Sequence, residues 1–268
     1  MADPRASPPP QFDHAVITVG ARMDEAVRVF RRLGFFVTPR GHHTLGSINH
    51  LIVFASTYLE LLGLPAERPD VRPELRDSPD GLDALVFRSH DADLTRAQAL
   101  ARGAPVQTVQ QFSRPVAFES GPRDARFRTV RTAPASAQAG RLYFCQHLTP
   151  ELVWHAPWRA HPNGATELVG ATLRVRDTGA EARLYRSLLG DAAVEPRGAG
   201  FRATAEPVAI EIAPGEERPA MTGLRIRVAD LERCAASLGE AGIAFGRETD
   251  ALAVRSEQAW NVSLRFVR

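Results

Sequence analysis

The first ordered segment that the hydrophobic pattern predicts is a β-strand over residues 12–19. Period-two alternation puts one set of its side chains on one face of the strand and the intervening set on the other. The first set is Phe12, His14, Val16 and Thr18, and the second is Asp13, Ala15, Ile17 and Val19. An amphipathic helix follows in MDEAVRVFRRLGF, where Gly34 ends the apolar stripe. Three further strands are predicted, in FFVTP (35–39), SINHLIVFA (47–55) and TYLELLGL (57–64).

This β-α-β-β-β order occurs four times along the chain. The later copies begin at GLDALVFRS (81–89), LVGATLRVRD (168–177) and MTGLRIRVAD (221–230), and each is followed by a helical pattern and further strands. One such unit cannot cover both faces of its own small sheet, so units must pair. Two units side by side would form a curved eight-stranded sheet, with helices outside and a cup inside. The turn-rich stretch WRAHPNGATE (158–167) separates two lobes, predicted at 12–160 and 167–268.

Composition indicates a globular protein and argues against several classes of partner. Of 268 residues, 44% are hydrophobic and 24% are charged, with a net charge of +2. All 33 basic residues are arginine, which indicates a compositional bias rather than a nucleic-acid-binding surface. The two cysteines, Cys145 and Cys234, form neither a metal motif nor a disulfide framework, which favours a cytoplasmic location. No apolar run is long enough to span a membrane, and residues 1–11 are expected to be a disordered leader.

Three residues in strand patterns stand out as candidates for chemistry. His14 could point into the cup or could be a hydrogen-bonded core residue. Glu60 lies in the otherwise apolar strand YLELLG, where an unpaired buried carboxylate would be costly. His147 ends FCQHLTP and could face the cup or bond to the turn that follows it. Two imidazoles and one carboxylate would leave open positions on a divalent ion.

The motifs DHAVITV, RLGFFVTPRGHH, GSINHLIVF and YLELLG resemble the glyoxalase-like domain proteins of the vicinal oxygen chelate superfamily, which also includes bleomycin resistance proteins and extradiol dioxygenases. The resemblance covers residues 12–63 and returns at RLYFCQHLTPELVW. It implies an α+β fold of four βαβββ units in two lobes with curved mixed sheets. It also implies a divalent metal (Zn, Fe, Mn, Ni or Co) in the cup, held by His14, Glu60 and His147.

Two departures from the family pattern affect this assignment. The fourth ligand position falls at Asp83, which could ligate a metal, or at Ala84, which could not. The ligand order His, Glu, His also differs from the His, His, Glu order of the ring-cleaving dioxygenases. The reaction class of lyase, isomerase or dioxygenase therefore stays open.

Four further residues are candidates for substrate binding. Asn49 could hydrogen-bond a substrate carbonyl or cap a strand edge, and His43 lies on a glycine-flanked loop before it. Tyr58 shares a strand face with Glu60. Trp154 could form a wall of the pocket, although aromatic residues after a strand usually serve packing.

The histidines divide the two lobes functionally. All eight lie at or before His161, so a histidine-based site must belong to the N-terminal lobe. In the C-terminal lobe, Gly170 and Gly223 occupy the positions that match His14, and the last strands supply only Glu211 as a ligand. We therefore expect a polar pocket in the first lobe and an apolar or closed cup in the degenerate second lobe.

The leading hypothesis is a metal-dependent enzyme that polarises a carbonyl, an enol or vicinal oxygens of a small organic substrate, with Glu60 also moving a proton. The rival is a metal-free protein that binds or sequesters a small molecule in the same cup, and a scaffold with a filled cup is a third possibility. A homodimer is compatible with the repeat pattern.

Overall fold

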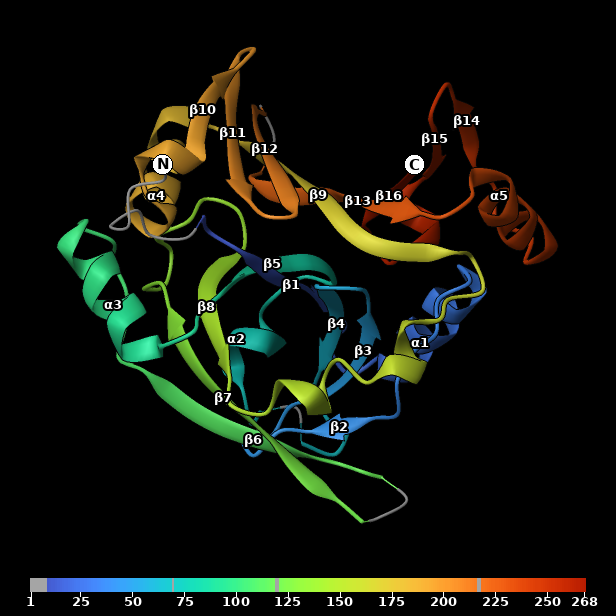
Figure 1. The fold of residues 1–268 in the computed structure, drawn as a ribbon, viewed down its shortest axis with the longest axis horizontal. Helices are drawn as coiled ribbons and strands as arrows, with labels where there is room; N and C mark the ends of the chain where they lie inside the picture. Colours follow the sequence, from blue (N-terminus) through green and yellow to red (C-terminus); the bar gives the residue numbers. More distant parts are fainter. Residues whose placement is uncertain (1–8, 69, 119–120, 216–217) are drawn as a thin grey trace, which may run out of the picture.

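Two eight-stranded sheets form the protein in the computed structural model, which describes residues 9–68, 70–118, 121–215 and 218–268 (Figure 1). Most of the expected leader lies outside these residues. Both sheets have the same strand order, β2-β3-β4-β1-β5-β8-β7-β6 in the first and β10-β11-β12-β9-β13-β16-β15-β14 in the second. The fold class expected from the repeats, four βαβββ units in two lobes of curved mixed sheet, is confirmed. No helix in the described part of the chain is long and apolar enough to cross a membrane.

The elements of the first lobe run from residue 12 to 147, followed by two short 3-10 turns at Pro150–Leu152 and Ala156–Arg159. Its first unit comprises β1 (Phe12–Thr18), α1 (Met23–Arg32), β2 (Gly41–His42), β3 (Ile48–Val53) and β4 (Tyr58–Gly63). The short helix α2 (Pro73–Arg76) leads into the second unit, which comprises β5 (Gly81–Arg88), α3 (Ala92–Ala101), β6 (Gln110–Val116), β7 (Arg123–Arg131) and β8 (Arg141–His147).

The second lobe repeats this order. Its first unit comprises β9 (Ala165–Val175), α4 (Thr178–Leu189), β10 (Val194–Arg197), β11 (Gly200–Ala205) and β12 (Val208–Pro214). Its second unit comprises β13 (Ala220–Val228), α5 (Leu231–Glu240), β14 (Gly246–Glu248), β15 (Ala251–Val254) and β16 (Ser263–Val267).

The predicted strand at 35–39 does not form. Thr38 N donates to the Leu51 carbonyl at 2.9 Å, but the Thr38 hydroxyl oxygen, rather than a main-chain carbonyl, accepts from Leu51 N at 2.8 Å. Pro39 follows and has no N–H to continue a ladder. The second strand of this unit is therefore only Gly41–His42, paired to β3.

Two β-bulges lie in the central antiparallel pair of the first lobe. Between Phe12 and His14, β1 has one residue more than β5, and this extra residue is Asp13. Between Ala84 and Leu82, β5 has one residue more than β1, and this extra residue is Asp83. The first bulge corrects the predicted alternation, because Phe12 packs with Ala15 and Ile17 instead of sharing the face of His14.

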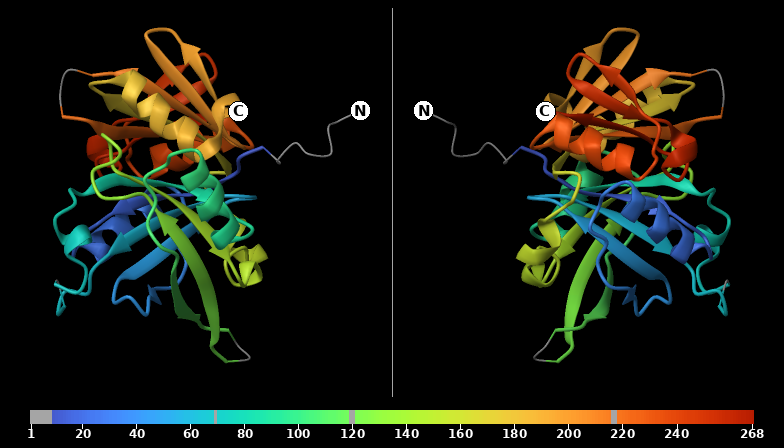
Figure 2. Two further views of the ribbon diagram at one scale, coloured as in Figure 1. Left: turned by 90° about the vertical axis from the view of Figure 1, so that its left-hand side faces the viewer. Right: turned by 90° about the vertical axis from the view of Figure 1, so that its right-hand side faces the viewer.

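One hydrophobic core joins the two lobes. The cluster combines residues of β1 and β5 with residues of β9 and β13, and it includes apolar faces of α1, α4 and α5. The side views in Figure 2 show the lobes stacked, with the N-terminal units below and the C-terminal units above. A second, smaller cluster fills much of the cup of the first lobe and includes Leu75 of α2. The lobes therefore share a core, while the cup belongs to the first lobe alone.

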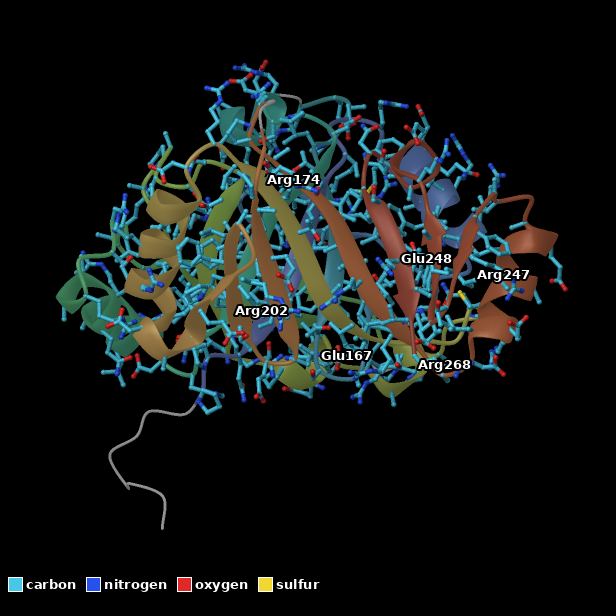
Figure 3. The ribbon with its side chains drawn as sticks, turned by 90° about the horizontal axis from the view of Figure 1, so that it is seen from above. Glu167, Arg174, Arg202, Arg247, Glu248 and Arg268 are labelled. Carbon is cyan, nitrogen blue, oxygen red and sulfur yellow. The ribbon has the colours of Figure 1, made fainter. Side chains whose placement is uncertain are left out.

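The second lobe turns an open face to solvent rather than a closed or apolar cup. Figure 1 shows its sheet curving away from the first lobe, and Figure 3 looks down on that face, where Arg174, Arg202 and Glu248 are labelled. The residues that line a hollow there include Glu211, Arg225 and Arg265. The expectation of an apolar or closed cup was wrong, because charged side chains line this open face.

Candidate functional site

His14 projects from the middle of the first sheet into the cup. Its ring stacks on Tyr58, with centroids 4.2 Å apart and planes 12° apart. Nδ1 of His14 donates to Asp13 Oδ1 at 2.7 Å. This hydrogen bond fixes the ring so that Nε2 faces the cup, 3.8 Å from Glu60 Oε2 and 3.5 Å from the Tyr143 hydroxyl. The bulge thus places a carboxylate directly behind the imidazole.

Asp13 is fully buried and accepts hydrogen bonds from three side chains. Besides His14, His147 Nε2 donates to Oδ1 at 2.9 Å and Arg88 Nε donates to Oδ2 at 3.1 Å. Burial favours the neutral acid, but the two imidazoles outweigh burial and hold the pKa of Asp13 far below its usual range. A carboxylate that orients a metal-binding or basic imidazole in this way is a common supporting group.

Glu60 faces His14 from the adjacent strand β4. Asn49 Nδ2 on β3 donates to Oε1 at 2.6 Å, and His43 Nε2 lies 3.7 Å from the same oxygen. Burial raises the pKa of Glu60, but His43, His14 and the bond from Asn49 outweigh it, so the pKa is lowered overall. A buried, ionised carboxylate therefore lies between two imidazole nitrogens.

His43 presents Nε2 to this cluster because its other nitrogen is occupied. Nδ1 lies 2.9 Å from the Ser47 hydroxyl, which also accepts from Arg72 Nη1 at 3.0 Å. Since Asn49 Nδ2 approaches His43 Nε2 at 3.3 Å as a donor, Nε2 is the acceptor and Nδ1 carries the hydrogen. Burial, helped by nearby arginines, lowers the pKa of His43 to about 4, although the charge of Glu60 acts to raise it. The ring is neutral at pH 7.

Protonation of His43 should destabilise the fold in mildly acidic solution. Because its pKa is lowered from 6.5 to about 4, the stability that the neutral ring confers is present above pH 6.5 and is lost as the pH falls toward 4. Urea midpoints measured from pH 7 to 4 should fall less in His43→Gln than in the wild type. A control, His42→Gln, changes an exposed ring and should follow the wild type. Equal slopes for all three proteins would contradict the prediction.

His147 lies at the end of β8, outside the small cavity that the other residues share. Its ring packs against Trp154, with centroids 4.9 Å apart, and against Tyr58 at 6.0 Å. Together with Asp13 and His14 it forms a group whose possible ligand atoms lie within 4.8 Å of one another. The structure brings His147 to Asp13 rather than to Glu60.

The cavity at the cup has a volume of about 40 Å³. Five of the predicted site residues line it, namely His14, His43, Asn49, Tyr58 and Glu60. Trp154 does not line it but packs on Tyr58, with centroids 5.7 Å apart, and lies under the Arg88 guanidinium. Asp83, the possible fourth ligand, is bonded to Thr18 and Arg141.

Several residues of the site were not predicted from the sequence. Asp13 was assigned to the opposite strand face, and the bulge that redirects it has no signature in the alternation of side chains. Tyr143, which meets His14, shares a strand face with His147 by alternation, but the sequence pattern assigned it no role in the site. Four arginines line the cavity: Arg72, Arg114, Arg131 and Arg141. Arginines at alternate positions of a strand could have indicated side chains that face the cup. The arginine-rich composition hid this signal.

Comparison with known proteins agrees with this architecture. The family model described as a glyoxalase-like domain matches residues 12–189. No curated protein matches the chain. Among solved structures, a hypothetical protein from Staphylococcus aureus is similar at a TM-score of 0.73 and 11% identity, covering 96% of this chain and 98% of that chain.

Two further structures share the fold at 15% identity. A triple mutant of 4-hydroxymandelate synthase from Streptomyces coelicolor has a TM-score of 0.62, covering 97% of this chain and 93% of that chain. A fusion of a xylose isomerase-like TIM barrel with 4-hydroxyphenylpyruvate dioxygenase has a TM-score of 0.63, covering all of this chain and 50% of that chain. At these identities the likeness concerns the fold.

Proposed function

Since the chain belongs to the glyoxalase-like domain family of the vicinal oxygen chelate superfamily, we propose that it is a divalent-metal-dependent enzyme acting on a small organic substrate. The observation that carries the proposal is the buried Glu60 carboxylate, which has His14 Nε2 at 3.8 Å and His43 Nε2 at 3.7 Å beside one small cavity. These three side chains would have to draw closer to share one ion, since the group of possible ligand atoms that lie within 4.8 Å of one another in the described residues is Asp13, His14 and His147. Nitrogen and carboxylate donors of this kind suit Zn, Fe, Mn, Ni or Co.

The Glu60 carboxylate is placed to attract a cation. The distances of 3.8 and 3.7 Å from Glu60 to the two imidazoles exceed hydrogen-bond length, so a buried negative charge faces two nitrogens without bonding to either. A divalent ion would neutralise this charge and leave positions open for substrate oxygens. Its chemistry there would be the polarisation of a carbonyl, an enol or a vicinal oxygen pair.

The Asp13, His14 and His147 group suits a supporting role. Asp13 is already satisfied by hydrogen bonds from both imidazoles and from Arg88, and it is fully enclosed. An ion there would displace those bonds and leave no space for a substrate. We therefore propose His43, rather than His147, as the third ligand beside His14 and Glu60, with Asp13 orienting His14.

The remaining side chains around the cavity position the substrate and its protons. Burial raises the pKa of Tyr143 well above its usual value, so its hydroxyl keeps its hydrogen and can donate to a substrate oxygen. Glu60 is ionised and lies close to His14, which the Tyr143 hydroxyl also approaches. It can therefore accept a proton from a bound substrate. Tyr58, Phe112 and Phe127 line the same cavity and exclude water.

Elemental analysis of protein purified without a nickel column tests the proposal and separates the two ligand sets. We expect about one ion per chain in the wild type and in the control His42→Ala, whose ring is exposed. His14→Ala, His43→Ala and Glu60→Ala should each bind the ion at least tenfold more weakly, while His147→Ala should retain it. Circular dichroism would establish that each variant is folded.

The opposite pattern, loss of the ion in His147→Ala and retention in Glu60→Ala, would place the metal at Asp13 and contradict the proposed ligands. A folded wild type that carries no ion, and gains no thermal stability from added Mn, Fe, Zn or Co, would instead support a metal-free binding protein.

A further inference from the structure

Four buried polar atoms of residues that line the cavity have no hydrogen-bond partner within the described residues, and two of them, a donor and an acceptor, are complementary. One is Nη2 of Arg114 and the other is Oδ1 of Asn49. Both residues line the cavity, and both are buried, at 5% and 2% exposure. A buried polar group without a partner is destabilising, so native proteins rarely leave one unpaired. Several such atoms around one cavity indicate an absent ligand.

The two side chains lie close together beside Gly41, which leaves space for both. A methyl group built at Gly41 would lie 2.3 Å from Asn49 Oδ1 and 3.0 Å from Arg114 Cδ. Any larger residue at this point would force the Asn49 or the Arg114 side chain to shift. The free donor and the free acceptor therefore belong to residues that contact the same few atoms of β2.

The chemistry of each free atom defines what it can bind. The Asn49 amide directs its nitrogen toward Glu60 and His43, so only its oxygen is free, and that oxygen requires a hydrogen donor. Arg114 has only donors and requires an acceptor. The ligand must therefore present an acceptor and a donor close together.

The charge around the cavity indicates that the acceptor is anionic. Four arginines and one carboxylate, Glu60, are among the lining residues of the described chain. Arg141 is paired with Asp83 and Arg72 with Glu74, both of which lie outside the lining. Arg114 is in no ion pair within the described residues. Arg131 lies 3.7 Å from Glu74 through Nη1, but its Nε has no hydrogen-bond partner among those residues. A divalent ion at Glu60 would add to this positive charge.

We propose that the cavity binds a compact hydroxycarboxylate, whose carboxylate accepts from Arg114 and whose hydroxyl donates to Asn49 Oδ1. This inference rests on the proposed function in that it concerns the same site. The cavity volume of about 40 Å³ supports a compact ligand, since a single water needs only about 10–15 Å³. A planar guanidinium pairs well with a carboxylate, and such charge-assisted bonds are the strong ones.

Calorimetric titration with three small probes tests each part of the recognition. Glycolate carries the carboxylate and the hydroxyl, acetate lacks the hydroxyl, and glycolamide lacks the charge. The wild type should bind glycolate at least tenfold more tightly than glycolamide and at least threefold more tightly than acetate. In Arg114→Gln the preference for glycolate over glycolamide should vanish. The control Arg123→Gln removes a surface arginine of the neighbouring strand, paired with Glu151, and should behave as the wild type.

The metal content of the same samples separates this inference from the proposed function. Equal binding of glycolate by the wild type and Arg114→Gln, or wild-type protein that holds its ion but does not prefer glycolate over glycolamide, would overturn the hydroxycarboxylate assignment alone. Protein without any ion that still binds glycolate through Arg114 would support this inference while contradicting the metal-dependent function. Thermal melting would establish that Arg114→Gln is folded.

Discussion

Replacing Asp13 by alanine should lower the free energy of unfolding by about 3–5 kcal/mol, because it leaves three side-chain donors around a buried site without their shared acceptor. His14, His147 and Arg88 all donate to this carboxylate, which has no exposed surface. Urea denaturation at pH 7 measures the effect. Asp24→Ala, which removes a largely exposed carboxylate paired with Arg40, serves as the matched control and should change stability by less than about 1 kcal/mol. A similarly small change in Asp13→Ala would contradict the bonding described for this residue.

The contribution of Asp13 should depend on pH in a defined direction. Its pKa in the folded protein lies far below its value of about 3.9 in unfolded chains. The stability that it confers is therefore fully present above about pH 5 and is lost as the pH falls below about 4. The difference in stability between the wild type and Asp13→Ala should shrink from pH 5 to pH 3. A constant difference over that range would show that the carboxylate is not stabilised in its ionised form.

Replacing Tyr185 by alanine should lower the free energy of unfolding by about 3–5 kcal/mol, as truncation of large buried aromatic side chains usually does. Tyr185 of α4 is fully buried in the core that joins the lobes, and its ring contacts Phe87 of β5 edge-on, with centroids 6.2 Å apart. Truncation would thus open a cavity between the two lobes. Thermal denaturation followed by circular dichroism measures the loss.

The phenylalanine variant of the same residue is the matched control. The Tyr185 hydroxyl has no hydrogen-bond partner within the described residues, so Tyr185→Phe removes an unsatisfied buried group and keeps the packing. We expect the free energy of unfolding of Tyr185→Phe to be equal to that of the wild type or higher by up to about 1 kcal/mol. A Tyr185→Phe variant that unfolds as readily as Tyr185→Ala would indicate that the hydroxyl, rather than the ring, holds the lobes together.

The repeat architecture could be predicted from the sequence because each unit carries its own local signals. A strand pattern of period two, a helix pattern of period 3.6 and turn residues recur in the same order, and they specify pairing without knowledge of distant contacts. The segment 35–39 was the exception, because Leu51 N bonds to the Thr38 hydroxyl instead of a main-chain carbonyl, and side-chain alternation does not encode that choice.

The candidate site was predicted in part for a related reason. Glu60 and Asn49 lie on regular strands, so alternation alone sends them to the cup. Asp13 lies at a bulge, where one extra residue reverses the faces, and the position of His147 follows from Asp13. Arg114 was missed because the sequence contains 33 basic residues, all arginine, and nothing in the pattern shows which of them is buried and lacks a partner.

The shared core also has a consequence for biosynthesis. When the first lobe leaves the ribosome, the apolar side of β1 and β5 that later contacts β9 and β13 is still uncovered. At about 5–20 residues per second, residues 165–268 take on the order of 5–20 s to be made. During that interval the nascent chain exposes Phe12, Ile17 and Phe87, and this apolar surface can aggregate or bind a chaperone. Slow synthesis through β9 would therefore lower the yield of folded protein, even though β9 contributes nothing to the cavity.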